Sequence, residues 1–97
     1  MEDRRKHPEK ALSAMKIRSA KPGKHCDGNG LYLVVDDSGA KRWLLRTVVR
    51  GKRRDIGLGG LRLVGLAEAR ELAAQLRKVA RNGGDPLAER QKVRRTV

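Results

Sequence analysis

The chain has 97 residues, and its 24 lysines and arginines outnumber its 11 aspartates and glutamates to give a formal net charge of +13. This length allows one small domain with a limited core, and the charge attracts polyanions. No signal-peptide pattern and no apolar run approaching about 20 residues occurs. The basic residues are dispersed rather than gathered in one amphipathic anchor, which favours nucleic acid over a membrane as partner. The lone cysteine, Cys26, excludes an internal disulfide and fits the cytoplasm, where we expect the protein.

The first third of the chain is predicted to hold one short helix. Residues 1–12 are polar and charged without periodicity, which predicts a flexible basic arm. Ser13 is a suitable N-cap for a short helix within residues 13–20. Turns are predicted at residues 21–24 and 27–30, where proline and glycine interrupt the pattern.

Three strand-like segments follow, over residues 31–35, 43–49 and 53–58. Asp36-Asp37-Ser38-Gly39 and Gly51-Lys52 are short connections between them, which predicts a meander of antiparallel strands. Side-chain alternation along each strand divides the sheet into two faces. The apolar face, predicted to be core, carries Leu31, Leu33, Val35, Trp43, Leu45, Ile56 and Leu58. The other face carries Tyr32, Val34, Arg42, Leu44, Arg46, Val48, Arg53 and Asp55.

The last predicted element is a helix from Leu66 to about Arg81, whose apolar residues recur at helical spacing until Asn82-Gly83-Gly84 ends it. This helix should cover the apolar face of the sheet. The predicted fold class is therefore α+β: a three-stranded antiparallel β-sheet packed on one long C-terminal α-helix, with a short N-terminal helix. The domain is predicted to span residues 13–86.

The densest positive charge lies between Lys41 and Arg54, where seven basic residues and no acidic residue occur. A two-stranded ribbon or small sheet fits the major groove of duplex DNA, which is about 12 Å wide. We assign Arg46 and Arg53, with Tyr32 beside them, to the surface that meets the groove. The candidates for phosphate contacts are Lys41, Arg50, Lys52 and Arg54, and Arg42 completes the predicted DNA-binding set.

No catalytic, metal or cofactor site is predicted. Cys26 beside His25 does not make a tetrahedral metal site, and neither a CxxC motif nor a spaced histidine pair occurs. Asp36 and Asp37 fit turn chemistry better than acid–base catalysis. The glycines do not precede a helix with the spacing of a phosphate-binding loop.

Several short motifs follow one another along residues 12–90. They are Lys16-Ile17-Arg18 with Lys21-Pro22-Gly23, Asp27-Gly28 with Gly30-Leu31-Tyr32-Leu33, Ser38-Gly39 with Lys41 and Trp43, Gly51-Lys52-Arg53-Arg54 with Gly57-Leu58-Gly59, Leu66-Ala67-Glu68-Ala69-Arg70, and Gly84-Asp85-Pro86. In their order and spacing they resemble the N-terminal arm-type DNA-binding domain of phage and genomic-island integrases, which are tyrosine recombinases.

The resemblance implies a sheet-on-helix domain that binds duplex DNA at arm-type sites flanking the recombination core. It also implies that the catalytic residues belong to a separate downstream domain, so that this fragment is not itself an enzyme. Residues 87–97 then begin the connector to that missing core-binding and catalytic region. Other integrase protomers are further partners that the missing domains would contact.

Two other interpretations of the basic sheet stay open. A double-stranded RNA-binding module has the same order of helix, three strands and helix, but it grips phosphates with lysines at the start of its last helix. Here that position reads Leu66-Ala-Glu-Ala-Arg, which is acidic where basic residues are needed. The third interpretation is a protein-interaction domain whose charge only confers solubility.

Overall fold

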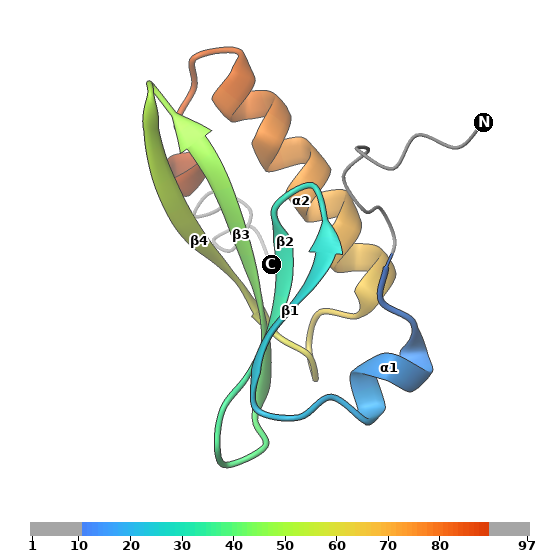
Figure 1. Cartoon of the computed structure of the whole chain (residues 1–97). Helices are drawn as coiled ribbons and strands as arrows, with labels where there is room; N and C mark the ends of the chain where they lie inside the picture. The colour runs from blue at the N-terminus through green and yellow to red at the C-terminus, as the bar shows by residue number, and fades with distance from the viewer. Residues whose placement is uncertain (1–10, 90–97) are drawn as a thin grey trace, which may run out of the picture.

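Tight turns join the strand-forming segments into a four-stranded antiparallel meander, β1-β2-β3-β4, with one helix packed along it (Figure 1). The computed structural model describes residues 11–89. In chain order its elements are α1 (Ala14–Arg18), β1 (Gly23–Gly28), β2 (Leu31–Val35), β3 (Lys41–Val49), β4 (Lys52–Gly60) and α2 (Leu66–Arg81). The arm expected at residues 1–12 and the connector expected at 87–97 therefore lie mostly outside the described residues.

The sheet has one strand more than the sequence analysis predicted. The sequence analysis assigned residues 23, 24, 27 and 28 to two turns and no strand to residues 25 and 26 between them, because glycine and aspartate have low strand propensity. Pairing with β2 overrides this local preference and makes the segment an edge strand, β1. The turn after it contracts to Asn29 and Gly30, whose φ angles of 54° and 85° are those of a two-residue hairpin turn.

The other predicted elements are confirmed. β2, β3 and β4 form the expected meander, and α1 begins where the Ser13 hydroxyl accepts a hydrogen bond of 3.2 Å from the backbone N–H of Lys16. α2 has the predicted bounds, but with 16 residues it is a helix of ordinary length rather than a long one. No helix among residues 11–89 combines the length and hydropathy needed to cross a bilayer.

The core lies between α2 and one face of the sheet. The seven apolar residues predicted for this sheet face are buried there, whereas Thr47, a further possible member of that face, is half-buried; α2 contributes the small or branched residues of its inner stripe. These helix residues are Ala69, Ala73, Leu76 and Ala80. Trp43 is fully buried, and its indole N–H donates a hydrogen bond of 2.7 Å to the carbonyl oxygen of Val64. Alternation along the strands thus placed Trp43 correctly in the core rather than against a base.

Candidate nucleic-acid interface

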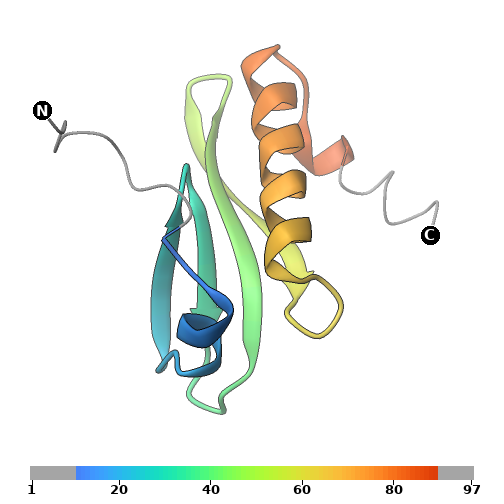
Figure 2. The same cartoon turned by 90° about the vertical axis from the view of Figure 1, so that its right-hand side faces the viewer.

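The side of the sheet that α2 leaves uncovered carries the candidate interface. α2 lies along the other side in both views (Figures 1 and 2). We call the uncovered side the open face. The strand register assigns to it Lys24, Cys26, Tyr32, Val34, Arg42, Leu44, Arg46, Val48, Arg53 and Asp55. All of these side chains are exposed or half-buried, so each can contact a partner laid on the sheet.

β3 and β4 continue beyond β2 as a two-stranded ribbon, which projects past the β1–β2 turn (Figure 1). β2 pairs with β3 only as far as Leu31 and Leu45, whereas the pairing of β3 with β4 continues to Val49 and Lys52. We call residues 46–55 the ribbon. It carries five basic residues and one acidic residue: Arg46, Arg50, Lys52, Arg53, Arg54 and Asp55.

The turn of the ribbon lies one residue earlier than the sequence analysis placed it. Arg50 and Gly51, with φ angles of 52° and 79°, form a two-residue turn, whereas Gly51-Lys52 had been taken as the connection. The shift matters because the turn sets the register of the hairpin. With the turn at residues 50 and 51, Arg46 lies directly opposite Asp55.

Arg46 is held between two neighbours on the open face. Its Nε donates to Oδ1 of Asp55 at 2.9 Å, and its Nη2 donates to Oδ2 at 3.4 Å. The guanidinium carbon also lies 5.4 Å from the centre of the Tyr32 ring, a cation–π distance. Arg46 is 29% exposed and Asp55 is 44% exposed, so the group faces outward although both side chains are engaged.

The electrostatics of this group follow from the same contacts. Hydrogen bonding from Arg46 lowers the pKa of the Asp55 carboxyl, partial burial opposes that shift, and the positive charges of Arg46, Lys24 and Arg53 assist it. Asp55 in turn raises the pKa of Arg46, first through the hydrogen bond and then through its charge. A charged pair thus persists at neutral pH within the basic ribbon.

The remaining predicted site residues, apart from Lys41, lie on the two sides of the sheet and ribbon. Arg53 and Arg42 join Arg46 and Tyr32 on the open face, where Arg42 donates a hydrogen bond of 2.6 Å to Asp36. Arg50, Lys52 and Arg54 are exposed along the turn and the opposite side of the ribbon.

Lys41 lies elsewhere in the fold. Its ammonium donates to the carbonyl oxygens of Ile17 and Arg18, at 2.8 and 3.1 Å, and so fastens the C-terminal end of α1 to β3. A cation at that end also interacts favourably with the unpaired carbonyls of the helix.

The sequence analysis missed two residues of the open face. Lys24 lies opposite Val34, and Cys26 lies opposite Tyr32, so both share the face of Arg42 and Arg46. Both belong to β1, which was not recognised as a strand. The alternation of Lys24 and Cys26 with His25 was the available signal, but the flanking glycines outweighed it.

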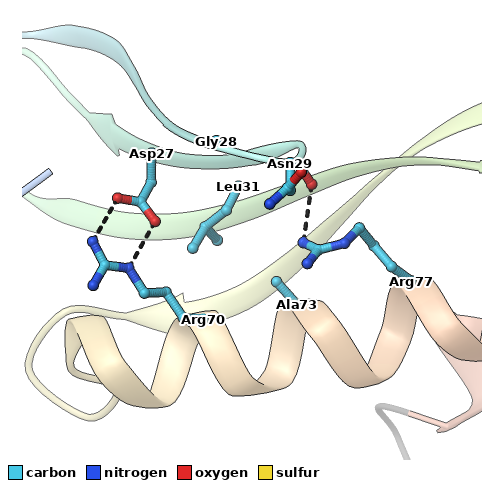
Figure 3. A pocket seen from close by; sticks show the side chains of 7 residues that line it. All are labelled: Asp27, Gly28, Asn29, Leu31, Arg70, Ala73 and Arg77. Atoms are coloured by element: carbon cyan, nitrogen blue, oxygen red, sulfur yellow. Dashed lines mark hydrogen bonds and ion pairs between the residues drawn. The ribbon is translucent and has the colours of Figure 1, made fainter. Parts of the chain in front are cut away.

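A pocket beside α2 is lined by residues whose side chains hold the fold together. Asp27 is 3% exposed, and its carboxylate oxygens accept hydrogen bonds of 2.8 and 2.9 Å from Nε and Nη2 of Arg70 (Figure 3). Arg77, about two turns further along α2, donates a hydrogen bond of 2.9 Å to the carbonyl oxygen of Asn29 in the same pocket. These contacts clamp β1 onto α2. Among residues 11–89 no three histidine, cysteine or carboxylate side chains gather in a way that could hold a metal ion.

The structure thus combines a basic ribbon, an uncovered sheet face and one helix packed on the other face, and its positive charge favours a polyanionic partner. The chain belongs to the arm DNA-binding domain family, whose profile matches residues 12–93. It is similar to an integrase of Shigella phage Sf6 and to the prophage integrase IntS of Escherichia coli. Each is 41% identical over 80 residues, which cover 78% of this chain and 21% of the relative.

These comparisons confirm the resemblance found from the short motifs, and with it the assignment as a DNA-binding domain of the integrase type. The chain spans about a fifth of the length of the curated relatives it matches, since the matched region is 21% of each.

Proposed function

We propose that this chain is the arm-site-binding part of a longer integrase, a site-specific tyrosine recombinase, and that it holds duplex DNA against its open face and ribbon. The observation that carries the proposal is the ribbon, residues 46–55, which projects beyond the sheet with five basic residues and one acidic residue. A two-stranded ribbon of this kind fits the major groove. For the whole integrase we propose that other domains carry out catalysis and contact other protomers, and that the protein acts in the cytoplasm.

Different residues have different tasks in this proposal. Arg42, Arg46 and Arg53, with Tyr32, face the groove because the register puts them on the open face. The basic residues at the turn and on the reverse side of the ribbon contact phosphates: Arg50, Lys52 and Arg54. We assign Lys41 to the support of α1, because its ammonium already bonds two carbonyl oxygens there.

Salt-dependent binding tests the proposal. A labelled DNA duplex is titrated with the full chain at several salt concentrations, and fluorescence anisotropy gives the affinity. If about six phosphates are neutralised, the logarithm of the affinity should fall with that of the salt concentration with a slope of about −5. Arg54→Ala, which removes a proposed phosphate contact, should lower that slope by about 1 and weaken binding, whereas Arg62→Ala, at an exposed loop residue, is the matched control.

The result also separates the alternatives. A flat salt response, or equal loss of binding in the two arginine variants, would contradict an interface on the ribbon. Duplex RNA that competes better than duplex DNA of the same length would favour the double-stranded RNA-binding module. No binding to either nucleic acid would favour the protein-interaction domain.

A further inference from the structure

The ribbon contains one acidic residue in its most basic stretch, and that residue lies directly opposite an arginine. Asp55 opposes Arg46, whereas Arg53 opposes the uncharged Val48. A carboxylate on a surface that meets DNA repels the phosphates and so weakens sequence-independent binding. Asp55 is therefore unfavourable for affinity alone, and its geometry points to a different contribution.

The contact with Asp55 uses one edge of the Arg46 guanidinium. Nε and Nη2 donate to the two carboxylate oxygens, at 2.9 and 3.4 Å. An arginine has five N–H donors in a planar fork, so this contact leaves the edge formed by Nη1 and Nη2 for a second bidentate partner. The Tyr32 ring supports the same group, with the guanidinium carbon 5.4 Å from its centre.

We propose that Asp55 and Tyr32 are positioning residues that hold the outer edge of Arg46 ready to read a guanine in the major groove. This inference rests on the proposed function and names the base that its central residue recognises. Guanine presents O6 and N7 as two neighbouring acceptors in that groove, and a bidentate arginine matches them. An arginine already fixed in place loses less side-chain freedom on binding than a mobile one. Asp55 thus lowers the affinity for DNA of any sequence and raises the discrimination at one base pair.

Selection of binding sites from a random duplex library tests this inference. The full chain is compared with Asp55→Asn, which keeps the shape but removes the charge, and with Asp37→Asn, which makes the same charge change in the exposed β2–β3 turn. The wild-type protein and Asp37→Asn should enrich a site with a guanine at one position. Asp55→Asn should reduce that enrichment at least about fivefold, the lower end of the discrimination expected of one good bidentate contact. It should bind unselected duplex as tightly as the wild-type chain, or more tightly.

Further variants show whether the effect acts through Arg46. Tyr32→Leu, which removes the ring that supports the Arg46 guanidinium, should weaken the preference. Replacing the selected guanine by 7-deazaguanine, which lacks N7, should weaken binding of the wild-type chain several-fold and change binding of Arg46→Ala less than twofold. The buried Trp43 reports by its fluorescence whether each variant is folded.

The outcomes distinguish the two proposals. If the wild-type chain retains no duplex, the proposed function fails. The role of Asp55 is overturned if the wild-type chain and Asp55→Asn select the same site with the same guanine frequency. It is also overturned if the site that the wild-type chain selects has no preferred guanine. In both cases the proposed DNA binding stands.

Discussion

Replacing Arg70 by alanine should destabilise the domain more than replacing its ionic partner, Asp27. The Asp27 side chain is only 4% exposed, and Nε and Nη2 of Arg70 reach its oxygens at 2.8 and 2.9 Å. Nη2 also donates to the carbonyl oxygen of Leu12 at 3.0 Å, while the Leu12 N–H donates to Asp27 at 2.9 Å. Asp27 raises the pKa of Arg70, so the pair stays charged. One ion pair therefore joins α2, β1 and the segment before α1.

The magnitudes follow from the unequal exposure of the two partners. Removal of one member of a buried pair costs about 3–5 kcal/mol, because the other charge is left away from water. Arg70→Ala leaves the nearly inaccessible Asp27 carboxylate without the guanidinium, so we expect about 3 kcal/mol. Asp27→Asn leaves Arg70, which is 27% exposed, able to reach water, so we expect about 1–2 kcal/mol.

Urea unfolding followed by the fluorescence of Trp43, the only tryptophan, measures both changes. The matched control is Arg81→Ala, an exposed arginine in the last turn of α2, which should change the free energy of unfolding by less than about 0.5 kcal/mol. A free energy of unfolding for Arg70→Ala within about 1 kcal/mol of the wild-type value, or a larger loss in Asp27→Asn than in Arg70→Ala, would contradict this role of the ion pair.

Three further predictions concern the sheet. The pKa of Asp55, followed by carboxyl NMR, should lie below its ordinary value of 3.8 and rise in Arg46→Gln; an unchanged value would contradict the contact. Because its pKa is lower in the folded state, this contact stabilises the fold above the unfolded-state pKa, and the contribution is lost as pH falls through the folded-state pKa. Gly30→Ala should destabilise the chain by more than about 2 kcal/mol, because the added Cβ would overlap the carbonyl oxygen of Arg46 at a φ of +85°. Gly39→Ala, with a φ of +89° and open space around it, should cost only about 1 kcal/mol in the same denaturation assay; equal losses would argue against the close approach. The exposed thiol of Cys26 should react with a maleimide several-fold more slowly in the presence of DNA, whereas equal rates would mean that DNA leaves this part of the open face uncovered.

The sequence predicted the features that depend on the periodic spacing of apolar residues. The alternation in β2, β3 and β4 placed Trp43, Leu45 and Ile56 in the core, and the helical period of α2 gave its bounds. Each pattern arises because a strand or helix buries one of its sides, so it can be read from the sequence of that segment alone.

The sequence analysis could not predict contacts between segments that are distant along the chain. β1 is a strand because β2 pairs with it, and Asp27 is buried because Arg70, 43 residues later, reaches it. The bonds from Lys41 to the carbonyl oxygens of Ile17 and Arg18 likewise join residues 24 and 23 positions apart. The opposition of Arg46 and Asp55 depends on the exact place of a two-residue turn, so an error of one position concealed it.

The most direct test of a DNA-binding open face is an amide NMR titration of the full chain with a DNA duplex. We expect the largest shifts in the ribbon, residues 46–55, and along β2, and little change on the exposed side of α2. Shifts concentrated on α2, with the ribbon unaffected, would show that DNA binds the opposite side of the molecule.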